Sequence, residues 1–413
     1  MPPRRRLTKS RADIPAEVVL SIVEELDAII DKVPDRRKAG RNVSLVAKSF
    51  RKPGTALVWG KRVFVLRPKK DILGGLLEHL EQHPLAGQSV RNMSIDGPGA
   101  KSMYPRPGKL VELFQLCTGL TSLAVEAVAE RAVELLEGVL GSGNNRLIAL
   151  MVNTGGHHSA AFPPADLLRL VTSFPKLRAL DLRVGFESSS ATQLVFPQAP
   201  AEPTLSLSSL YLSVGSAAQY GPPKTPSYDL FLPAFLAHIN PSSLTSFTST
   251  YFHPTDTTLF SFVASCTSLI SLTFHASLSS GADVLPPLNT LLTSLSAHNT
   301  LLHFSLTFGI TQRAIVSPAL RTAFLSSLPL SLETYAVNLP LKLDAAPLEG
   351  FLEERKEGRL REFRTAFLKR DEEGKPVLRS DGEKTFDYVS LKKEEREDGR
   401  GKKWVVEVMD YWT

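Results

Sequence analysis

The clearest internal repeat is Leu177-Arg-Ala-Leu-Asp-Leu182, which returns 30 residues later as Leu207-Ser-Ser-Leu-Tyr-Leu212. Leucine occupies the first, fourth and sixth positions of both copies. The spacing of two residues between the last two leucines is that of a β-strand whose alternate side chains face inward. The same phrase, with other apolar residues allowed, recurs along the chain. Its middle apolar position falls at residues 93, 123, 150, 180, 210, 247, 272, 306 and 335, and at 363 in a last possible copy.

Stretches with the apolar spacing of helices lie between these copies, for example residues 130–140 and 285–295. Successive copies are 25 to 37 residues apart. A strand–helix unit of this length cannot bury its apolar face alone, so its neighbours must cover it. We therefore expect an α/β solenoid in which parallel strands line the concave side and helices cover the convex side.

This pattern resembles the leucine-rich-repeat family over roughly residues 85–365. The Asn or Cys that the family places after the phrase is mostly absent here, so the resemblance implies an irregular array. A doubly wound parallel sheet is the alternative fold, because strands alternate with helices there as well.

The two cysteines follow the same repeat. Cys117 lies three residues before Leu120, and Cys266 lies three residues before Leu269, where Phe174 holds the equivalent place before Leu177. Equivalent places in a solenoid have equivalent surroundings, so both cysteines are expected to be small buried core residues. Two cysteines cannot form a disulfide framework.

The N-terminal region predicts two helices. Asp13 is a suitable N-cap with Pro15 in the first turn, and Val18 begins an apolar stripe with four-residue spacing. A polar, basic connector covers residues 31–41, and a second helix follows with Leu45, Val46 and Phe50 as its apolar residues. Trp59 and a strand-like stretch at residues 63–66 come next.

This arrangement resembles an F-box. Ile14-Pro15 matches the Leu-Pro of the family, Leu45-Val46 matches its Leu-Val pair, and Trp59 matches its late aromatic residue. The first leucine is replaced by isoleucine, and the connector is longer and more basic than in the family. The resemblance implies that the module buries apolar anchors in a groove of the Skp-type adaptor of a cullin–RING ubiquitin ligase. The implied anchors are Ile14, Pro15, Val18, Leu45, Val46 and Trp59. The alternative is that these residues pack the first cap of the solenoid.

Charge divides the chain, whose net charge is +6, into three compositions. Residues 1–70 carry 18 basic and 7 acidic side chains, residues 201–330 carry only 7 charged side chains, and residues 342–413 carry 17 basic and 18 acidic ones. The basic head is either a solubilising arm or a contact for an acidic partner or nucleic acid. Nucleic acid is the less expected partner, because no aromatic or Gly-rich RNA-binding motif is interleaved with the charge.

The C-terminal region predicts a β-hairpin. Residues 385–391 and 403–409 are prone to form strands and flank a charged turn. The hairpin is expected to cover the last edge of the solenoid, and a separate recognition element is the alternative. The predicted organisation is a basic disordered arm (1–11), an F-box-like helical module (12–66), a leucine-rich-repeat solenoid (67–365) and a charged hairpin cap (366–413).

Motifs for catalysis are missing from the sequence, which has no Walker A, GxGxxG, GxSxG, HExxH or CxxC pattern. His79 and His83 have helical metal-ligand spacing, but without a third ligand they are interpreted as a solvated last turn. We expect no enzyme activity and no catalytic, cofactor-binding or metal-binding residue. No apolar run is long enough to cross a bilayer, and the N-terminus has no signal peptide, so a cytoplasmic or nuclear location without membrane attachment is expected.

A client protein is expected to bind the concave face of the sheet. The strand residues that alternate with the inward leucines point to this face, and they are rich in hydroxyl groups. The most distinctive candidates are Arg183, Tyr211, Thr273 and His275. The alternative is that these positions form only a solvated sheet face. The predicted function is the substrate-recognition subunit of an F-box-type ubiquitin ligase, with an unknown client. The alternative function is a repeat scaffold that binds an acidic partner or nucleic acid through its basic head.

Overall fold

The computed structural model describes residues 55, 63–66, 72–97, 107–143, 146–154, 162–186, 200–216, 226–252, 257–276, 285–296, 299–308, 327–340, 350–353, 355, 358–368, 386–395 and 402–409. The predicted basic arm and nearly all of the predicted F-box-like module lie outside these residues. The chain divides into two compact units, one of residues 1–127 and 134–147 and the other of residues 128–133 and 148–413.

The first unit contains a parallel sheet whose strands follow one another in chain order. Met93 and Leu123, two middle apolar positions of the repeat, pair with each other, and Met93 also pairs with Phe64. Its strands are β1 (Val63–Leu66), β2 (Asn92–Gly97) and β3 (Ser122–Ala127), and its helices are α4 (Ile72–Gln82), α5 (Pro84–Ser89) and α6 (Pro107–Leu116). Helix α7 (Ala129–Gly141) contains residues of both units.

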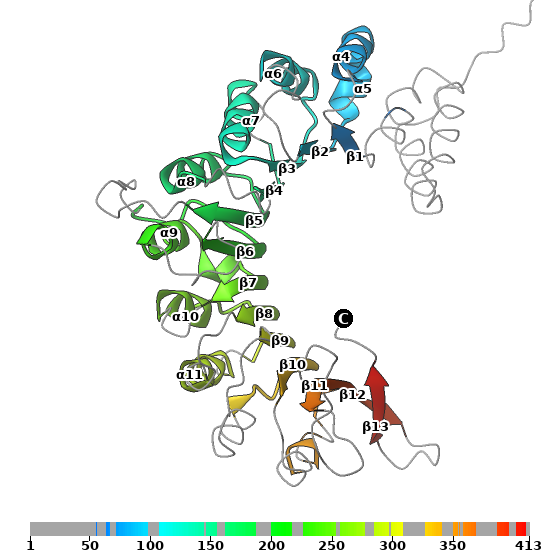
Figure 1. Ribbon diagram of the computed structural model, residues 1–413, viewed down its shortest axis with the longest axis vertical. Helices are drawn as coiled ribbons and strands as arrows, with labels where there is room; N and C mark the ends of the chain where they lie inside the picture. Colours follow the sequence, from blue (N-terminus) through cyan, green and yellow to red (C-terminus); the bar gives the residue numbers. More distant parts are fainter. Residues whose placement is uncertain are drawn as a thin grey trace, which may run out of the picture. The chain divides into compact units, whose positions relative to one another are not determined.

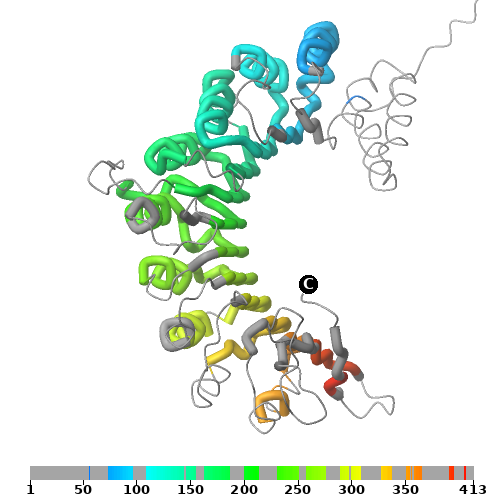
Figure 2. The backbone as a smooth tube through the Cα atoms, viewed as in Figure 1, coloured from blue at the N-terminus to red at the C-terminus, as the bar shows by residue number. Residues whose placement is uncertain are grey.

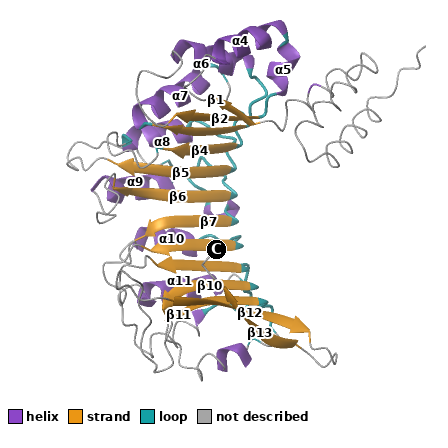
Figure 3. Ribbon diagram, turned by 45° about the vertical axis from the view of Figure 1, so that its right-hand side comes forward, coloured by secondary structure: helices purple, strands orange, loops and turns teal. Residues whose placement is uncertain are grey.

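The second unit is a longer stack of the same kind. Its parallel strands are β4 (Ala149–Asn153), β5 (Ala179–Phe186), β6 (Ser209–Ser216), β7 (Ser246–Phe252), β8 (Ser271–Ala276), β9 (His303–Phe308), β10 (Thr334–Pro340) and β11 (Glu362–Leu368). They pair in chain order, as Figure 3 shows by a row of arrows. Antiparallel strands β12 (Phe386–Glu395) and β13 (Lys402–Met409) follow.

Helices cover one face of this second sheet. They are α8 (Pro164–Thr172), α9 (Pro226–Leu236), α10 (Thr257–Ala264) and α11 (Leu285–Ser296), with a short 3-10 helix η3 (Pro241–Ser243). All four α-helices lie on the same side of the strands (Figure 1). Each helix packs against the next in chain order, as the backbone tube also shows (Figure 2).

The fold is therefore mixed α/β with a mostly parallel, open sheet. A doubly wound sheet reverses its strand order at a switch point and carries helices on both faces. In the second unit the order runs from β4 to β11 without a reversal, and the described helices cover one face only. In both its strand order and the placement of its helices, the second unit differs from a doubly wound sheet.

The register of the strands corrects one expected position. Leu272 of β8 pairs with Phe304 of β9, and Phe304 pairs with Tyr335 of β10. The middle apolar position of this copy is therefore Phe304, and the prediction of Leu306 was wrong. A shift of two residues keeps the same side chains inward, so the apolar pattern alone did not distinguish the two positions.

The core lies between the sheet and its helices. The middle apolar positions of β4 to β11 pair across the sheet, and each side chain is at most 2% exposed. Aromatic rings join the layers, because Phe231 of α9 lies 4.8 Å from Phe186 of β5 between ring centroids. The paired core residues are Leu150, Leu180, Leu210, Phe247, Leu272, Phe304, Tyr335 and Phe363.

The cysteines occupy equivalent turns, as expected from their spacing. The carbonyl groups of Cys117, Phe174 and Cys266 each accept a hydrogen bond from the backbone N–H three residues later, at 3.1 to 3.2 Å. All three side chains are fully buried. Burial raises the pKa of both thiols to about 12, so the cysteines are inert core residues at neutral pH.

A ladder of backbone carbonyls ties each repeat of the second unit to the next. The carbonyl oxygen just before each strand accepts hydrogen bonds from two consecutive N–H groups of the following repeat, at 2.7 to 3.2 Å. Hydroxyl groups add to the ladder where Ser208 and Thr245 donate to the carbonyls of Arg178 and Ser208. We call this set the carbonyl ladder; its acceptors are Ile148, Arg178, Ser208, Thr245, Ile270, Leu302 and Glu333.

The expected C-terminal hairpin is formed by β12 and β13, and β12 pairs antiparallel with β11. The pairing satisfies the backbone groups along the edge of β11. Lys393 donates to the carbonyls of Arg355 and Gly358 at 2.8 and 3.0 Å, and its ammonium lies 5.2 Å from the centroid of Trp404. The indole Nε1 of Trp404 donates to the carbonyl of Leu352 at 3.2 Å.

We predict that Leu210→Ala destabilises the protein strongly, whereas the neighbouring Ser209→Ala does not. Leu210 is 1% exposed and is paired between Leu180 and Phe247, so truncation leaves a cavity that costs about 2–5 kcal/mol. Ser209 lies on the opposite face, where a change of no more than about 0.5 kcal/mol is expected. Urea denaturation followed by circular dichroism measures both values. Equal effects of the two substitutions would contradict the assigned faces.

Candidate functional site

The sheet face opposite the helices of the second unit is polar, because inward apolar residues alternate with outward polar ones. Three outward rows cross the strands in register. We call them together the polar face. Its first row is Ser209, Ser246, Ser271, His303, Thr334 and Glu362; its second is Asp181, Tyr211, Thr248, Thr273, Ser305, Ala336 and Arg364; and its third is Arg183, Ser213, Thr250, His275 and Thr307.

Two of the four predicted client residues lie side by side on β5 and β6. Arg183 forms two hydrogen bonds to the carboxylate of Asp181, at 3.0 and 2.9 Å. Its guanidinium carbon lies 4.7 Å from the centroid of the Tyr211 ring, which is a cation–π distance. The guanidinium of Arg183 is therefore held by the carboxylate of Asp181 and the ring of Tyr211.

The other two predicted residues, Thr273 and His275, lie on β8. Strand β7 separates them from β6, so the four residues form two groups and not one cluster. Thr273 is opposite Thr248 and Ser305, and His275 is opposite Thr250 and Thr307. Burial lowers the pKa of His275, so this ring is neutral at physiological pH.

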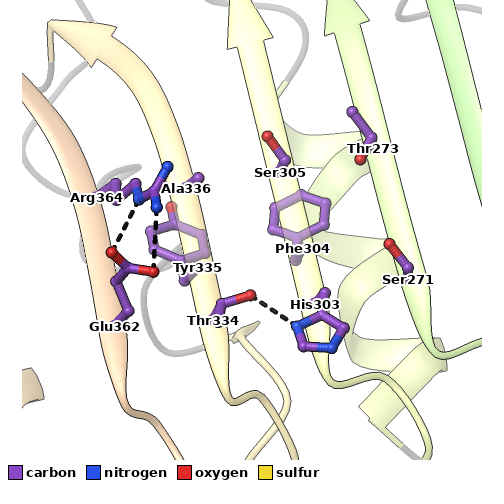
Figure 4. Close-up of a pocket in the computed structure, with 10 residues that line it drawn as sticks. All are labelled: Ser271, Thr273, His303, Phe304, Ser305, Thr334, Tyr335, Ala336, Glu362 and Arg364. Atoms are coloured by element: carbon purple, nitrogen blue, oxygen red, sulfur yellow. Dashed lines mark hydrogen bonds and ion pairs between the residues drawn. The ribbon is translucent and has the colours of Figure 1, made fainter. Parts of the chain in front are cut away.

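A hollow of about 350 Å³ opens on the polar face over strands β8 to β11. Ser305 and Ala336 are small neighbours in the second row, and they leave room beside the larger Arg364. Phe304 and Tyr335 also contribute to the lining, and their stacked rings, with centroids 5.9 Å apart, are buried in the core. Figure 4 shows the lining residues, which are Ser271, Thr273, His303, Phe304, Ser305, Thr334, Tyr335, Ala336, Glu362 and Arg364.

An ion pair forms one wall of the hollow. Arg364 donates from Nε to Oε1 of Glu362 at 3.0 Å and from Nη2 to Oε2 at 3.4 Å (Figure 4). The hydroxyl of Ser390 on β12 donates to the same Oε1 at 3.0 Å. Burial alone would raise the pKa of Glu362. The hydrogen bonds from Arg364 and Ser390, with the positive charges of Arg364 and Lys392, outweigh burial and hold this pKa below its ordinary value.

Hydroxyl groups and one histidine form the rest of the lining. The Nδ1 atom of His303 and the hydroxyl of Thr334 are hydrogen-bonded at 2.8 Å, and the direction depends on the histidine tautomer. Within the described part of the chain, no protein group bonds the hydroxyls of Ser271, Thr273 or Ser305. These three hydroxyls are therefore available to a bound molecule as donors or acceptors.

Sequence reasoning placed Thr273, Ser305 and Ala336 on the outward face and singled out Thr273, but it missed the residues of this hollow with the most distinctive chemistry. Glu362 and Arg364 flank Phe363, which was recognised only as a last possible copy of the repeat. Their alternation around Phe363 was the signal that could have found them. His303 was missed because it lies one residue before the middle apolar position, whereas the outward positions considered were those that follow it.

The other sites expected from the sequence lie in the N-terminal region and near helix α4. The adaptor anchors Ile14, Pro15, Val18, Leu45, Val46 and Trp59 lie outside the described residues. The rings of His79 and His83 have centroids 4.6 Å apart. In the ranges that the structure describes, no group of His, Cys, Asp or Glu side chains is arranged to hold a metal ion. Among the described helices, none combines the length and apolar character needed to span a bilayer.

Comparison with known proteins gives no further assignment: no protein-family model matches the sequence, and no curated protein is significantly similar to it.

We predict that Arg364→Gln raises the pKa of Glu362, because the substitution removes two hydrogen bonds and a positive charge. A carboxyl group whose pKa is depressed by folding stabilises the protein above its unfolded pKa, and this contribution is lost as the pH falls through the folded pKa. The variant should therefore lose less stability than the wild type on acidification over that range.

NMR titration of the Glu362 side-chain carboxyl carbon measures this pKa directly. The matched control is Arg183→Gln, which breaks the ion pair on β5 and should leave the Glu362 titration unchanged. An unchanged pKa of Glu362 in the Arg364→Gln variant would show that the ion pair does not form.

Proposed function

We propose that this chain is the substrate-recognition subunit of an F-box-type cullin–RING ubiquitin ligase. In this proposal the N-terminal module binds a Skp-type adaptor, and the polar face of a leucine-rich-repeat solenoid binds a client protein. The observation that carries it is the in-register polar face, an extended surface of hydrogen-bonding side chains joined in one chain to an F-box-like sequence. The other subunits of such a ligase supply the chemistry, so the role requires no catalytic residue here.

The leucine-rich-repeat assignment is supported by the recurring phrase and by strands that pair in chain order. In the family pattern an Asn follows the phrase, and here that residue is mostly absent. The carbonyl ladder and the hydroxyls of Ser208 and Thr245 provide links between repeats instead. These features support an irregular leucine-rich-repeat solenoid.

The adaptor half of the proposal depends on apolar anchors. Ile14-Pro15 and Leu45-Val46 match the family positions that enter the adaptor groove, with Val18 and Trp59 beside them. A few side chains that lose all contact with water at an interface contribute most of its affinity. Replacing such anchors with charged residues should therefore abolish binding.

The client half depends on the polar face. Outward positions on β6 to β9 carry hydroxyl groups, Tyr211 and two histidines, and none of them is Asp, Glu, Lys or Arg. Such a surface suits an extended segment that binds through hydrogen bonds, with Tyr211 supplying apolar contact area.

A second candidate function follows from the basic head, where residues 1–70 carry 18 basic against 7 acidic side chains. A repeat scaffold could bind an acidic partner or nucleic acid through this region. Such binding weakens steeply with salt, because phosphate contacts release counterions.

Pull-down by a purified Skp-type adaptor tests the first proposal. The wild-type chain should be retained, and a triple variant with Ile14→Asp, Pro15→Ala and Leu45→Asp should be lost from the beads. The matched control is Tyr211→Ala with His275→Ala, which alters the polar face and should bind the adaptor like the wild type. Circular dichroism checks that each variant is folded.

Failure of the folded wild-type chain to bind the adaptor would contradict the ligase proposal. The N-terminal helices would then be a solenoid cap, and steeply salt-dependent binding to generic DNA or RNA would favour the scaffold function instead.

A further inference from the structure

We propose that the hollow over β8 to β11 binds the uncharged amide side chain of an Asn or Gln within an extended segment of the client. The inference rests on the proposed function, because it names the chemistry that the polar face recognises. Three features of the hollow support it: its charge balance, its hydrogen-bonding groups and its neighbours on the sheet.

The hollow contains two opposite charges that neutralise each other. Glu362 and Arg364 are 3.0 Å apart, and their side chains are only 20% and 34% exposed. A charged client side chain placed here would be attracted by one partner and repelled by the other, and it would lose its hydration. Lys392 also acts on Glu362, but it is exposed and does not line the hollow. An uncharged polar group avoids this conflict.

The hydrogen-bonding groups match an amide. Oε1 of Glu362 already accepts from Arg364 and Ser390, whereas Oε2 accepts only one long bond of 3.4 Å from Arg364. Oε2 therefore has capacity to accept an N–H from a ligand. The hydroxyl of Ser305 can donate to a ligand oxygen. A primary amide carries both an N–H donor and a carbonyl acceptor, so it satisfies both sides of the hollow.

The hollow also has the size and surroundings of a site for one residue of a longer segment. Its volume of about 350 Å³ lies at the small end of the range of ligand pockets. Beyond it, towards β6, the second row continues with Thr248 and Tyr211 at one strand spacing each. An extended chain leaving the hollow in this direction meets further uncharged hydrogen-bonding groups.

Selection from a displayed library of random peptides on the immobilised full-length chain tests the proposal. The wild type should enrich peptides with Asn or Gln at one fixed position. Glu362→Gln removes the carboxylate that pairs with Arg364 in the hollow, so acidic residues should replace the amide at that position. Arg364→Gln leaves the carboxylate unbalanced, so Lys or Arg should replace it. In a synthetic copy of a selected peptide, changing the amide to a carboxylate should weaken binding to the wild type by about tenfold or more.

The matched controls are Asp166→Asn and Arg169→Gln, which change the charges of an exposed ion pair on helix α8, on the side of the sheet opposite the polar face. Both should enrich the same peptides as the wild type, and thermal denaturation confirms that every variant is folded. The proposal is overturned if the wild type enriches charged residues or no consensus, or if Glu362→Gln and Arg364→Gln leave the consensus unchanged.

This selection needs no adaptor, so its outcome is separate from that of the ligase proposal. An amide consensus in a chain that fails to bind the adaptor would support the site and exclude the ligase role. Adaptor binding without a consensus would exclude the site alone.

Discussion

The carbonyl ladder is the interaction on which the rest of the second unit depends. One carbonyl before each strand accepts two N–H groups from the next repeat, so three backbone polar groups are satisfied at each step from Ile148 to Glu333. A buried backbone group without a partner is costly, so this pattern fixes where each strand begins relative to its neighbour. Register then follows along the whole strand, and it determines which side chains face the helices and which face the solvent.

The polar face is a consequence of that register. Because side chains alternate, a slip of one residue at any step would turn leucines outward and hydroxyl groups into the core. With the register fixed, small residues on neighbouring strands fall next to each other, as Ser305 and Ala336 do, and the hollow exists because they coincide. The same constraint places Glu362 and Arg364 on one side of β11 while Phe363 between them is fully buried. Core packing and the candidate site are thus two results of one backbone pattern.

The repeat phrase was enough to predict the strands, their parallel pairing in chain order and the buried cysteines, because each depends on the spacing of apolar residues along the chain. The position of Phe304 was not predicted, since moving a strand by two residues preserves its apolar face. Most of the residues that line the hollow were not predicted, and the reason is different. It depends on how large and small side chains combine across four strands, and one of those strands, β11, carries a weak copy of the phrase. The adaptor anchors remain a prediction from resemblance, because they lie outside the described residues.

The central claim is that chain order and spatial order coincide in the second unit, with one strand spacing per repeat. Pulsed electron–electron double resonance measures the distance between two nitroxide labels and so tests this order directly. Cys117 and Cys266 are replaced by Ala so that only the introduced cysteines carry labels. One label is placed at Met151 on β4, and the second is moved from Thr248 to Thr273 and then to Ser305. The account predicts that the mean distance increases by about 5 Å at each move. A distance that shortens, or that changes without this order, would contradict it.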